Sequence, residues 1–290
     1  MIDHVGIIGL GKMGGALAER LLEQGYNVSG WSRSGVQAEL VEAGVQPLRG
    51  VVEVVGAVEV VFTSLPDDEA VLLIMNEIAG AEPKNKIVVD TSTVTAHTTR
   101  VAHALLHQAG AELVDAPIAG GPAVLRKGMV GSMMAGSADA AEVVRLVLEA
   151  YSRQVSYFGA PGNGMIAKTV NNSLGHGYVL ALIKGLELSE KSGIDRETML
   201  DFLSTSPMAS GMMSHFVGNI LGRDEVTAFT IDQILGDLEI FIANYKAAGI
   251  DTTLQNAFGA YYREASKAGL GDADLSMAIR FAADQAKESQ

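Results

Sequence analysis

The stretch HVGIIGLGKMGGALAERLL, residues 4–22, decides the fold of the first half of the chain. It joins a β-branched run to a helical run through glycines that have the spacing G-x-G-x-x-G. The first glycine allows a tight turn, the second lets the backbone approach a pyrophosphate, and the third lets the helix pack closely on the strand. Free N–H groups at the start of the helix attract an anion. We therefore predict a dinucleotide site, with a glycine-rich turn lacking a ligand as the alternative. Its residues are Gly9, Leu10, Gly11, Met13 and Gly14.

Short β-branched runs and helical runs alternate through the first half of the chain. The strand candidates are apolar on both faces, which suits a parallel sheet covered by helices. They are HVGIIGL, YNVSGW, AVEVVFTSLP, KIVVDTST, AELVDAPI, VGSMMAG and QVSYFG. This pattern predicts an α/β fold with an N-terminal Rossmann-type, doubly wound sheet.

The pattern changes at PGNG, residues 161–164, after which every long segment has helical period without strand runs. Because glycine and asparagine can cap an incoming helix, we expect a helix to begin near Gly162 or Asn163. The sequence therefore predicts two domains. Residues 1–161 form an NAD(P)-binding, Rossmann-type domain, and residues 162–290 form an all-helical, all-α domain.

The composition excludes several classes of protein. The chain of 290 residues has 48% hydrophobic residues, no cysteine and a net charge of −13. Without cysteine there are no disulfides or thiolate sites, which favours a cytoplasmic location. A negative charge without any basic run opposes binding to nucleic acid or anionic membranes. We expect a soluble protein whose partner is a small-molecule substrate, with no nucleic acid and no membrane partner.

The end of the second strand candidate, YNVSGW, indicates which cofactor is bound. An acidic residue there would bind the ribose 2′-hydroxyl of NAD(H). The sequence has Ser32, Arg33 and Ser34 instead, and a guanidinium flanked by hydroxyls suits a 2′-phosphate. NADP(H) is therefore favoured over NAD(H); the alternative is that Arg33 is a solvated loop charge.

Two later strand ends should approach the same ligand, because ligands of parallel sheets bind at the carboxyl ends of the strands. Leu65 and Pro66 follow one strand, and Ser92 and Thr93 follow the next. We expect Leu65, Pro66 and Thr93 to flank the nicotinamide, although such residues are also common in ordinary loops.

The segment GNGMIAKTVNN, residues 162–172, contains a single lysine, Lys168. Helical spacing places Lys168, Asn171 and Asn172 on neighbouring positions of one face. Near the start of a helix, the dipole and partial burial both disfavour a charged ammonium group. Lys168 could therefore exchange a proton with a carbonyl or alcohol oxygen. The alternative is that its side chain extends to solvent, as is usual for lysine.

Seven motifs occur in an order that resembles a known family. They are GLGKMG at 9–14, SLPDDEAV at 64–71, DTST at 90–93, DAPIAGG at 115–121, GNGMIAKTVNN at 162–172, GDLEI at 236–240 and GLGDADLS at 269–276. Together they resemble the β-hydroxyacid dehydrogenase family, which includes 3-hydroxyisobutyrate dehydrogenase, tartronate semialdehyde reductase, glyoxylate/succinic semialdehyde reductase and phosphogluconate dehydrogenase. The resemblance implies a Rossmann-type domain followed by a helical domain for substrate binding and oligomerisation. It also implies a homodimer or homotetramer.

The resemblance assigns roles to individual residues. Lys168 matches the family's catalytic lysine, Asn172 the asparagine that orients the substrate, and Thr93 a hydroxyl near the nicotinamide and the substrate. Gly120 and Gly121 match the backbone that holds the substrate carboxylate. Asp237 matches the aspartate of a Lys-Asp-Leu motif, and with Ala119 and the two glycines it is expected to line the substrate site.

Two positions depart from the family pattern. Ala119 stands where a serine is usual in the substrate loop, and Gly236 stands where a lysine usually precedes Asp237. Losing a charge-assisted hydrogen bond costs about 1.5–3 kcal/mol, or roughly one to two orders of magnitude in preference. We therefore expect a larger or less carboxylate-dependent β-hydroxyacid or aldehyde as substrate.

The resulting hypothesis is an NADP(H)-dependent oxidoreductase that transfers hydride to or from a β-hydroxyacid or its semialdehyde, with Lys168 as acid/base. One alternative is imine reduction, for which the resemblance implies another residue at Lys168. A second alternative is a non-catalytic NADP-binding or interaction module. His103 and His107 have the spacing of a metal pair but no further ligands nearby, so we predict no metal.

Overall fold

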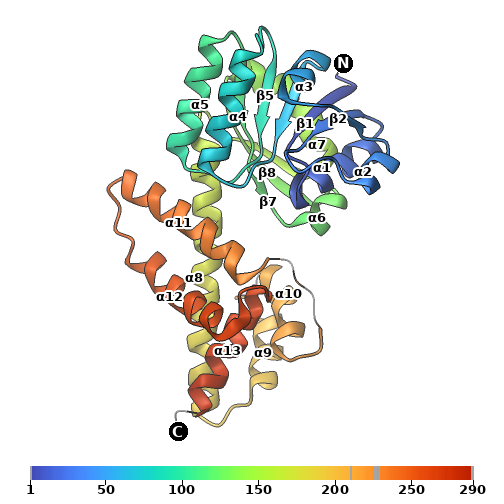
Figure 1. Ribbon diagram of the computed structural model, residues 1–290. Coiled ribbons are helices and arrows are strands. Elements are labelled where there is room, and N and C mark those ends of the chain that lie inside the picture. The colour runs from blue at the N-terminus through green and yellow to red at the C-terminus, as the bar shows by residue number, and fades with distance from the viewer. Residues whose placement is uncertain (1, 210, 225–226, 228, 289–290) are drawn as a thin grey trace. The chain divides into compact units, whose positions relative to one another are not determined.

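The chain forms two compact units (Figure 1). The computed structural model describes residues 2–209, 211–224, 227 and 229–288, and its units are Met1–Thr169 and Val170–Gln290. Helix α8 (Asn163–Lys191) crosses this division and begins where the sequence predicts a helix. We keep residues 1–161 and 162–290 as the proposed domains, because the strands end before α8 begins.

The first unit is built on a sheet of nine strands in the order β3-β2-β1-β4-β5-β6-β8-β7, with β9 paired to β8. The strands are β1 (His4–Ile8), β2 (Asn27–Trp31), β3 (Gln46–Pro47), β4 (Val60–Thr63), β5 (Ile87–Asp90), β6 (Glu112–Asp115), β7 (Ile118–Ala119), β8 (Val130–Gly136) and β9 (Ser152–Tyr157). The change of direction from β3-β2-β1 to β4-β5-β6 is the doubly wound topology that the sequence predicts.

The sheet is parallel from β1 to β6 but not at its far edge. Strand β8 runs antiparallel to both β6 and β7, and β9 is parallel to β8. The parallel sheet that the apolar strands suggested is therefore present from β3 through β6, and the far edge is mixed. The connection from β6 to β8 turns back through β7 and the short helix α6 (Pro122–Arg126), so that β8 enters the sheet in the opposite direction to β6.

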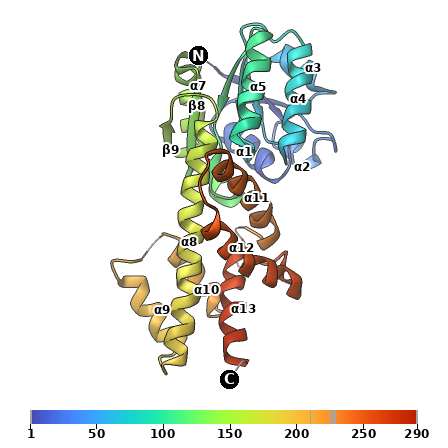
Figure 2. The same ribbon diagram turned by 90° about the vertical axis from the view of Figure 1, so that its left-hand side faces the viewer.

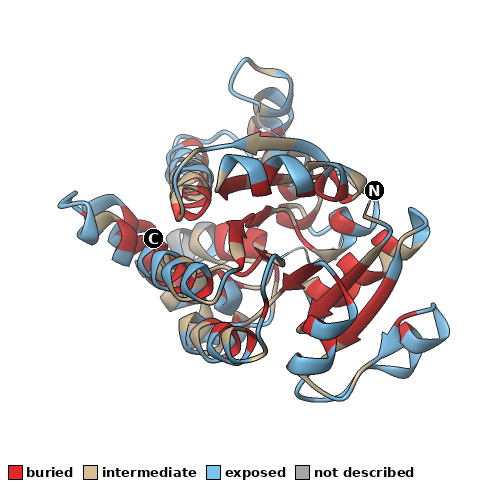
Figure 3. Cartoon of the chain, turned by 90° about the horizontal axis from the view of Figure 1, so that it is seen from above, coloured by how far each residue is buried: buried red, intermediate tan, exposed pale blue. Residues whose placement is uncertain are grey.

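Helices cover both faces of this sheet, as Figures 1 and 2 show. Side chains alternate along β1, so that Ile7 packs in one hydrophobic cluster and Ile8 in the other. The first cluster includes α1 (Lys12–Glu23), α2 (Ala38–Glu42) and α7 (Ala138–Tyr151), and the second includes α3 (Val51–Ala57), α4 (Asp68–Gly80) and α5 (Ala96–Gln108). In Figure 3 the strands are largely buried, while the outer sides of the helices are exposed.

Beyond the first turns of α8, the second unit is helical in all its described elements. They are α9 (Arg196–Thr205), α10 (Gly211–Ile220), α11 (Ile231–Ala247), α12 (Thr253–Ala265), the π-helical segment η1 (Ser266–Leu270) and α13 (Leu275–Glu288). Leu186, Leu238 and Phe258 lie at the centre of its hydrophobic core. No helix within the described ranges is long and apolar enough to cross a membrane.

Candidate active site

The three glycines of the first loop have the conformations that a dinucleotide site requires. Gly9 has φ +93°, and a side chain there would overlap the carbonyl oxygen of Ser64. A side chain at Gly14 would overlap the carbonyl oxygen of Gly9. At Gly11 a Cβ atom would meet nothing within 4 Å, so only this glycine borders open space. The loop therefore leaves room for a ligand beside Gly11 while Gly14 brings α1 against β1.

The start of α1 is suited to a pyrophosphate. Gly11 is the N-cap of this helix, and no side chain caps the helix. Its first N–H groups are consequently available to an anion. Leu10 is buried and Met13 half-buried, so the remaining residues of the loop contribute mainly packing and backbone.

The segment after β2 presents polar groups to solvent. Ser32 and Ser34 lie in a turn closed by the hydrogen bond from Gly35 N to Ser32 O, and their Oγ atoms are 3.5 Å apart. Arg33 is exposed and forms no hydrogen bond or ion pair with the described residues. Two hydroxyls and an unengaged guanidinium fit a phosphate group on the ribose.

Four strand ends lie side by side at one edge of the sheet. Ile8 pairs in register with Thr63, Thr63 with Asp90, and Asp90 with Asp115. The loops that follow β4 and β5 are joined by a hydrogen bond of 2.9 Å from the backbone N–H of Leu65 to Ser92 Oγ. The structure therefore brings Gly9, Leu65, Pro66 and Thr93 to the same edge, as the sequence predicts.

Lys168 and Thr93 are in direct contact within the first unit. The Nζ atom of Lys168 donates a hydrogen bond of 2.6 Å to Thr93 Oγ1. Lys168 is only 8% exposed, so its side chain does not extend to solvent. The Thr93 hydroxyl forms no other hydrogen bond within the described part of the chain, and its own proton can be donated to a ligand.

The helix that carries Lys168 is fixed to the sheet by Asp115, at the end of β6. Asp115 Oδ1 accepts a hydrogen bond of 3.0 Å from Gly162 N, and Oδ2 accepts one of 2.9 Å from Gly164 N. Burial raises the pKa of the Asp115 carboxyl to about 6, although these hydrogen bonds lower it. A carboxylate at this position also interacts favourably with the positive end of the helix.

A second buried carboxylate, Asp90, organises the loop that contains Thr93. Its Oδ1 atom accepts hydrogen bonds from Thr63 Oγ1 at 2.8 Å, Ser92 Oγ at 2.6 Å and Ser92 N at 3.2 Å. The Oδ2 atom has no partner among the described residues. Burial raises the pKa of Asp90, while the bonds from Ser92 and Thr63 lower it. Asp90 therefore holds Ser92, the residue directly before Thr93.

The loop expected to bind the substrate carboxylate follows β7. Gly120 has φ +137°, and a Cβ atom there would lie 2.7 Å from Val130 Cγ1, so only glycine fits. Gly121 is the N-cap of the short helix α6. Ala119 is half-buried and pairs with Gly131 in the antiparallel ladder. The backbone of this loop is thus fixed, and a serine hydroxyl is absent from it.

Two predicted site residues belong to the second unit. Asn172 follows Lys168 by one turn of α8 and accepts a hydrogen bond of 3.0 Å from Asn171 Nδ2. Asp237 is half-buried in α11. A Cβ atom at the neighbouring Gly236 would meet nothing within 4 Å, so a side chain has room there. The roles of Asn172 and Asp237 stay predictions.

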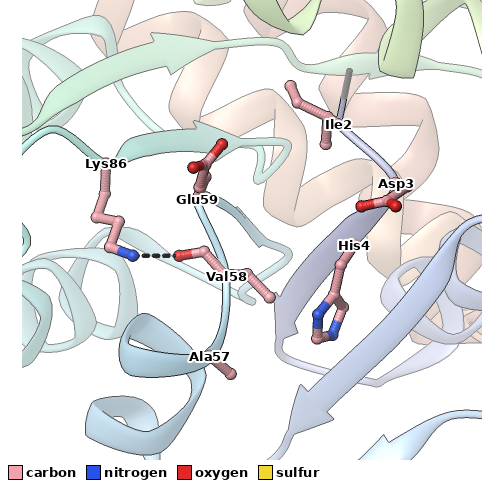
Figure 4. Close-up of a pocket in the computed structure, with 7 residues that line it drawn as sticks. All are labelled: Ile2, Asp3, His4, Ala57, Val58, Glu59 and Lys86. Carbon is pink, nitrogen blue, oxygen red and sulfur yellow. Dashed lines mark hydrogen bonds between the residues drawn. The ribbon is translucent and has the colours of Figure 1, made fainter.

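Two further polar features of the first unit are a histidine pair on α5 and a small cavity. The His103 and His107 rings stack 6.0 Å apart, and no group of three or more His, Cys, Asp or Glu side chains suited to a metal is found among the described residues. A cavity of about 180 Å³ lies at the amino ends of β1, β4 and β5 (Figure 4). The ammonium group of Lys86 donates to the carbonyl of Val58 there. This cavity lies at the opposite edge of the sheet from Thr93, which follows the carboxyl end of β5.

Sequence reasoning assigned no role to Asp90 or Asp115. Both are acids that directly follow apolar strand residues, which is the signal that could have found them. Their partners, however, include backbone N–H groups 47 and 49 residues away from Asp115, which no local pattern reveals.

The glycine loop, the doubly wound sheet and the helical unit place the chain in the class of nicotinamide-dinucleotide-binding proteins. Residues 4–159 match the family described as the NAD binding domain of 6-phosphogluconate dehydrogenase. Residues 162–282 match the family described as NAD-binding of NADP-dependent 3-hydroxyisobutyrate dehydrogenase. The chain therefore belongs to the β-hydroxyacid dehydrogenase family, and it is an NAD(P)-dependent enzyme of the 3-hydroxyisobutyrate dehydrogenase type.

Individual relatives are similar along almost the whole chain. L-threonate dehydrogenase from Cupriavidus necator is 29% identical over 97% of this chain and 96% of its own length. Glyoxylate/succinic semialdehyde reductase 1 from Arabidopsis thaliana is 26% identical over 95% of this chain and 97% of its own. The human cytokine-like nuclear factor N-PAC is 27% identical over 95% of this chain, which spans only 51% of that protein.

Solved structures share the fold. The Mycobacterium tuberculosis 3-hydroxyisobutyrate dehydrogenase with L-serine has a TM-score of 0.87 at 24% identity, covering 97% of this chain and 99% of that one. The imine reductase from Bacillus cereus has a TM-score of 0.64 at 26% identity, covering 96% and 98%.

Proposed function

We propose that this enzyme interconverts a β-hydroxyacid and its semialdehyde with NADP(H), using Lys168 as the proton donor and acceptor. The observation that carries the proposal is the 2.6 Å hydrogen bond between Lys168 Nζ and Thr93 Oγ1. It places an almost fully buried ammonium group beside a hydroxyl at the carboxyl edge of the sheet, where dinucleotide-binding folds bind their ligands.

The nicotinamide cofactor, when bound, supplies the hydride for reduction and accepts it in oxidation. In reduction, Lys168 gives a proton to the oxygen of the former carbonyl group and becomes neutral. In oxidation, neutral Lys168 takes the hydroxyl proton before or as the C–H bond breaks. Thr93 donates its hydroxyl proton to the substrate oxygen while accepting from Lys168, which orients that oxygen toward the ammonium group. Asn172 is proposed to hold the substrate.

The preference for NADP(H) over NAD(H) is supported by the segment after β2. Arg33 is exposed and unengaged, Ser32 and Ser34 flank it, and no acidic side chain stands there. An acid would repel a 2′-phosphate, whereas a guanidinium binds it through paired hydrogen bonds.

The substrate class is supported by the fixed loop at Gly120 and Gly121 and by the names of the relatives. Backbone N–H groups of such a loop suit a carboxylate. Ala119 and Gly236 remove a hydroxyl and a cation that the family pattern contains, so we infer a substrate that is larger or less dependent on its carboxylate than the short hydroxyacids.

The assembly and the location of the protein complete the proposal. A homodimer or homotetramer is supported by the exposed apolar side chains of Val170, Leu174 and Leu188 along α8. A cytoplasmic location rests on the absence of cysteine.

Two other functions have some support. The fold is shared with imine reductases, which supports imine reduction as one alternative. The similarity to N-PAC, whose name is that of a nuclear factor, supports a non-catalytic NADP-binding or interaction module as the other. The buried pair of Lys168 and Thr93 favours proton transfer to a substrate oxygen. A binding module needs no such pair, and for imine reduction the resemblance implies another residue at position 168.

The test follows NADPH consumption with a panel of short and bulky semialdehydes. We expect Lys168→Ala to lower turnover at least about a hundredfold while NADPH binding is kept. Lys184→Ala is the matched control, because Lys184 lies on the same helix but is exposed and paired with Glu187. Near-normal turnover of Lys168→Ala would rule out the acid/base role. Consumption of NADPH with imines only would favour the alternative chemistry.

A further inference from the structure

We propose that two buried carboxylates, Asp90 and Asp115, are positioning residues that together hold Thr93 and Lys168 at hydrogen-bonding distance. The inference deepens the proposed function, since it rests on Lys168 as the proton carrier. It assigns a role in the reaction to the first residues of the DTST and DAPIAGG motifs, for which the sequence analysis proposed none.

Asp115 fixes the helix that carries the lysine. Both oxygens of its carboxylate are used, one by Gly162 N and the other by Gly164 N, and Lys168 lies one turn beyond Gly164 on α8. Because helical residues move together, a shift of this first turn moves the Lys168 backbone by a similar amount. The carboxylate therefore sets where the lysine side chain starts.

The backbone around these contacts leaves little freedom. Gly162 has φ +84°, a conformation that favours glycine. At Gly164 a Cβ atom would lie 2.6 Å from Asp115 Oδ2 and would overlap the carbonyl oxygen of Met133. The start of α8 is thus pressed against the end of β6 and the middle of β8, and the close approach that allows the hydrogen bonds to Asp115 depends on both glycines.

Asp90 fixes the loop that carries Thr93, the hydrogen-bond partner of Lys168. Its Oδ1 atom accepts from the backbone and hydroxyl of Ser92, so the loop cannot rotate at Ser92 without breaking two hydrogen bonds. Ser92 Oγ in turn accepts from Leu65 N, which ties the loop after β4 to the loop after β5. Thr93, the next residue, is held by this arrangement.

The two carboxylates are themselves held in register. Asp90 and Asp115 are paired on neighbouring parallel strands, and both are 1% exposed. These contacts form a closed ring. Asp90 is hydrogen-bonded to Ser92, whose neighbour Thr93 accepts from Lys168, and α8 leads from Lys168 back to Gly164, which donates to Asp115. The pairing of Asp115 with Asp90 closes the ring. Two buried acids at strand ends are costly to retain, and the geometry of the ring gives them a function.

The experiment compares Asp115→Asn with the parent enzyme, alone and in a Lys168→Ala background. Asparagine keeps the size of the side chain but replaces one acceptor oxygen by an NH₂ group, which cannot accept from Gly162 or Gly164. We expect turnover to fall at least about tenfold in the parent background, since displacements of about 1 Å cost up to a hundredfold. In the Lys168→Ala background the same change should cost less than about twofold, because coupled residues are not additive.

Two further measurements separate positioning from loss of structure. The affinity for NADPH should change less than about threefold, which corresponds to less than 1 kcal/mol. Hydrogen exchange of the amides of residues 162–169 should become faster in Asp115→Asn without a matching change in the rest of the first unit. The control is Asp195→Asn, a change at the N-cap of α9, whose side chain is exposed. It should leave turnover and this exchange unchanged.

Asp90→Ala tests the other half of the ring and serves if Asp115→Asn does not fold. Its turnover should also fall at least about tenfold, and the loss should shrink in a Thr93→Val background. The proposal is overturned if either carboxylate variant keeps turnover within about twofold of the parent, or if its loss is undiminished when its partner is already removed. Should the parent reduce no semialdehyde, the proposed function fails, and the exchange at residues 162–169 alone decides the role of Asp115.

Discussion

Lys168 donates a hydrogen bond of 2.6 Å to Thr93, a residue 75 positions earlier in the chain. The two side chains come from the start of α8 and from the loop after β5. Each is anchored by a separate carboxylate, so the distance between them is a property of the fold and does not depend on a flexible lysine finding its partner.

Thr93→Val removes the hydroxyl but keeps the shape of the side chain. We expect turnover to fall by at least about tenfold, because the hydrogen bond from Lys168 to the Thr93 hydroxyl is lost and the substrate oxygen loses a donor. Thr93→Ser keeps the hydroxyl and should retain most of the turnover. Steady-state kinetics of the two variants check this, and a Thr93→Val enzyme as fast as Thr93→Ser would contradict it.

Arg33→Ala should weaken the binding of NADPH by at least about tenfold, the effect of losing one charge-assisted contact, and leave NADH binding nearly unchanged. Fluorescence titration with both cofactors measures the two affinities. Arg145→Ala, at a half-buried residue of α7 whose guanidinium is paired with Glu142, is the control. Equal weakening for both cofactors would mean that Arg33 contacts a part of the nucleotide that they share.

Ala119→Ser restores the hydroxyl that the family pattern contains. We expect kcat/KM for short hydroxyacids of three or four carbons to rise about tenfold, with little change for bulkier substrates. Kinetics across a graded series of substrates measures the change in preference. If the parent already prefers the smallest acids, the inferred tolerance for larger substrates is wrong.

Gly236→Ala should stabilise the protein. Gly236 is exposed inside α11, and a Cβ atom there meets nothing within 4 Å. Replacing glycine by alanine in a helix interior contributes about 0.5–1 kcal/mol. Chemical denaturation measures the change in the free energy of unfolding. A loss of stability would show that glycine is required there for a reason other than helix geometry.

His176 should make the second unit less stable in mild acid. Its ring is packed against Phe241, Phe258 and Tyr262, and burial lowers its pKa from 6.5 to about 4. Between these values the unfolded chain binds a proton that the folded chain does not, so stability is lost as the pH falls from 6.5 toward 4. The shift corresponds to about 3 kcal/mol at most.

The measurement compares unfolding of the parent and of His176→Gln at pH 7.5 and pH 5. The difference between the two proteins isolates the histidine, since Asp115, with its pKa raised to about 6, acts in the opposite direction over the same range. The parent should lose more stability than the variant on acidification. An equal loss in both proteins would assign the acid sensitivity to other groups.

Much of the first unit could be predicted from short-range patterns. The positive φ of Gly9, the open space beside Gly11 and the contact of Gly14 with the carbonyl oxygen of Gly9 match the three reasons read from the motif. The contact of Gly9 with Ser64 is the one part of this arrangement that the motif does not contain. The start of α8 at Asn163 was also predicted, from the glycines and asparagine of PGNG, whereas its hydrogen bonds to the distant Asp115 were not.

Other features depend on distant contacts that no local pattern contains. The antiparallel pairing of β8 with β6 depends on the path of the connecting chain. The valine-rich segment of α3 is helical because Val51, Val54 and Val55 bury one helical face. The burial and partners of Asp90 and Asp115 follow from strand register. For Lys168, sequence spacing left solvent exposure open as an alternative, and burial beside Thr93 removes it.

The attachment of α8 to Asp115 fixes a length as well as a position. Each residue added to a helix turns all later side chains by about 100° around its axis. A single insertion or deletion between Gly164 and Lys168 would therefore leave the anchor intact yet point the lysine away from Thr93. In this short interval the protein can vary its side chains, but it cannot vary their number.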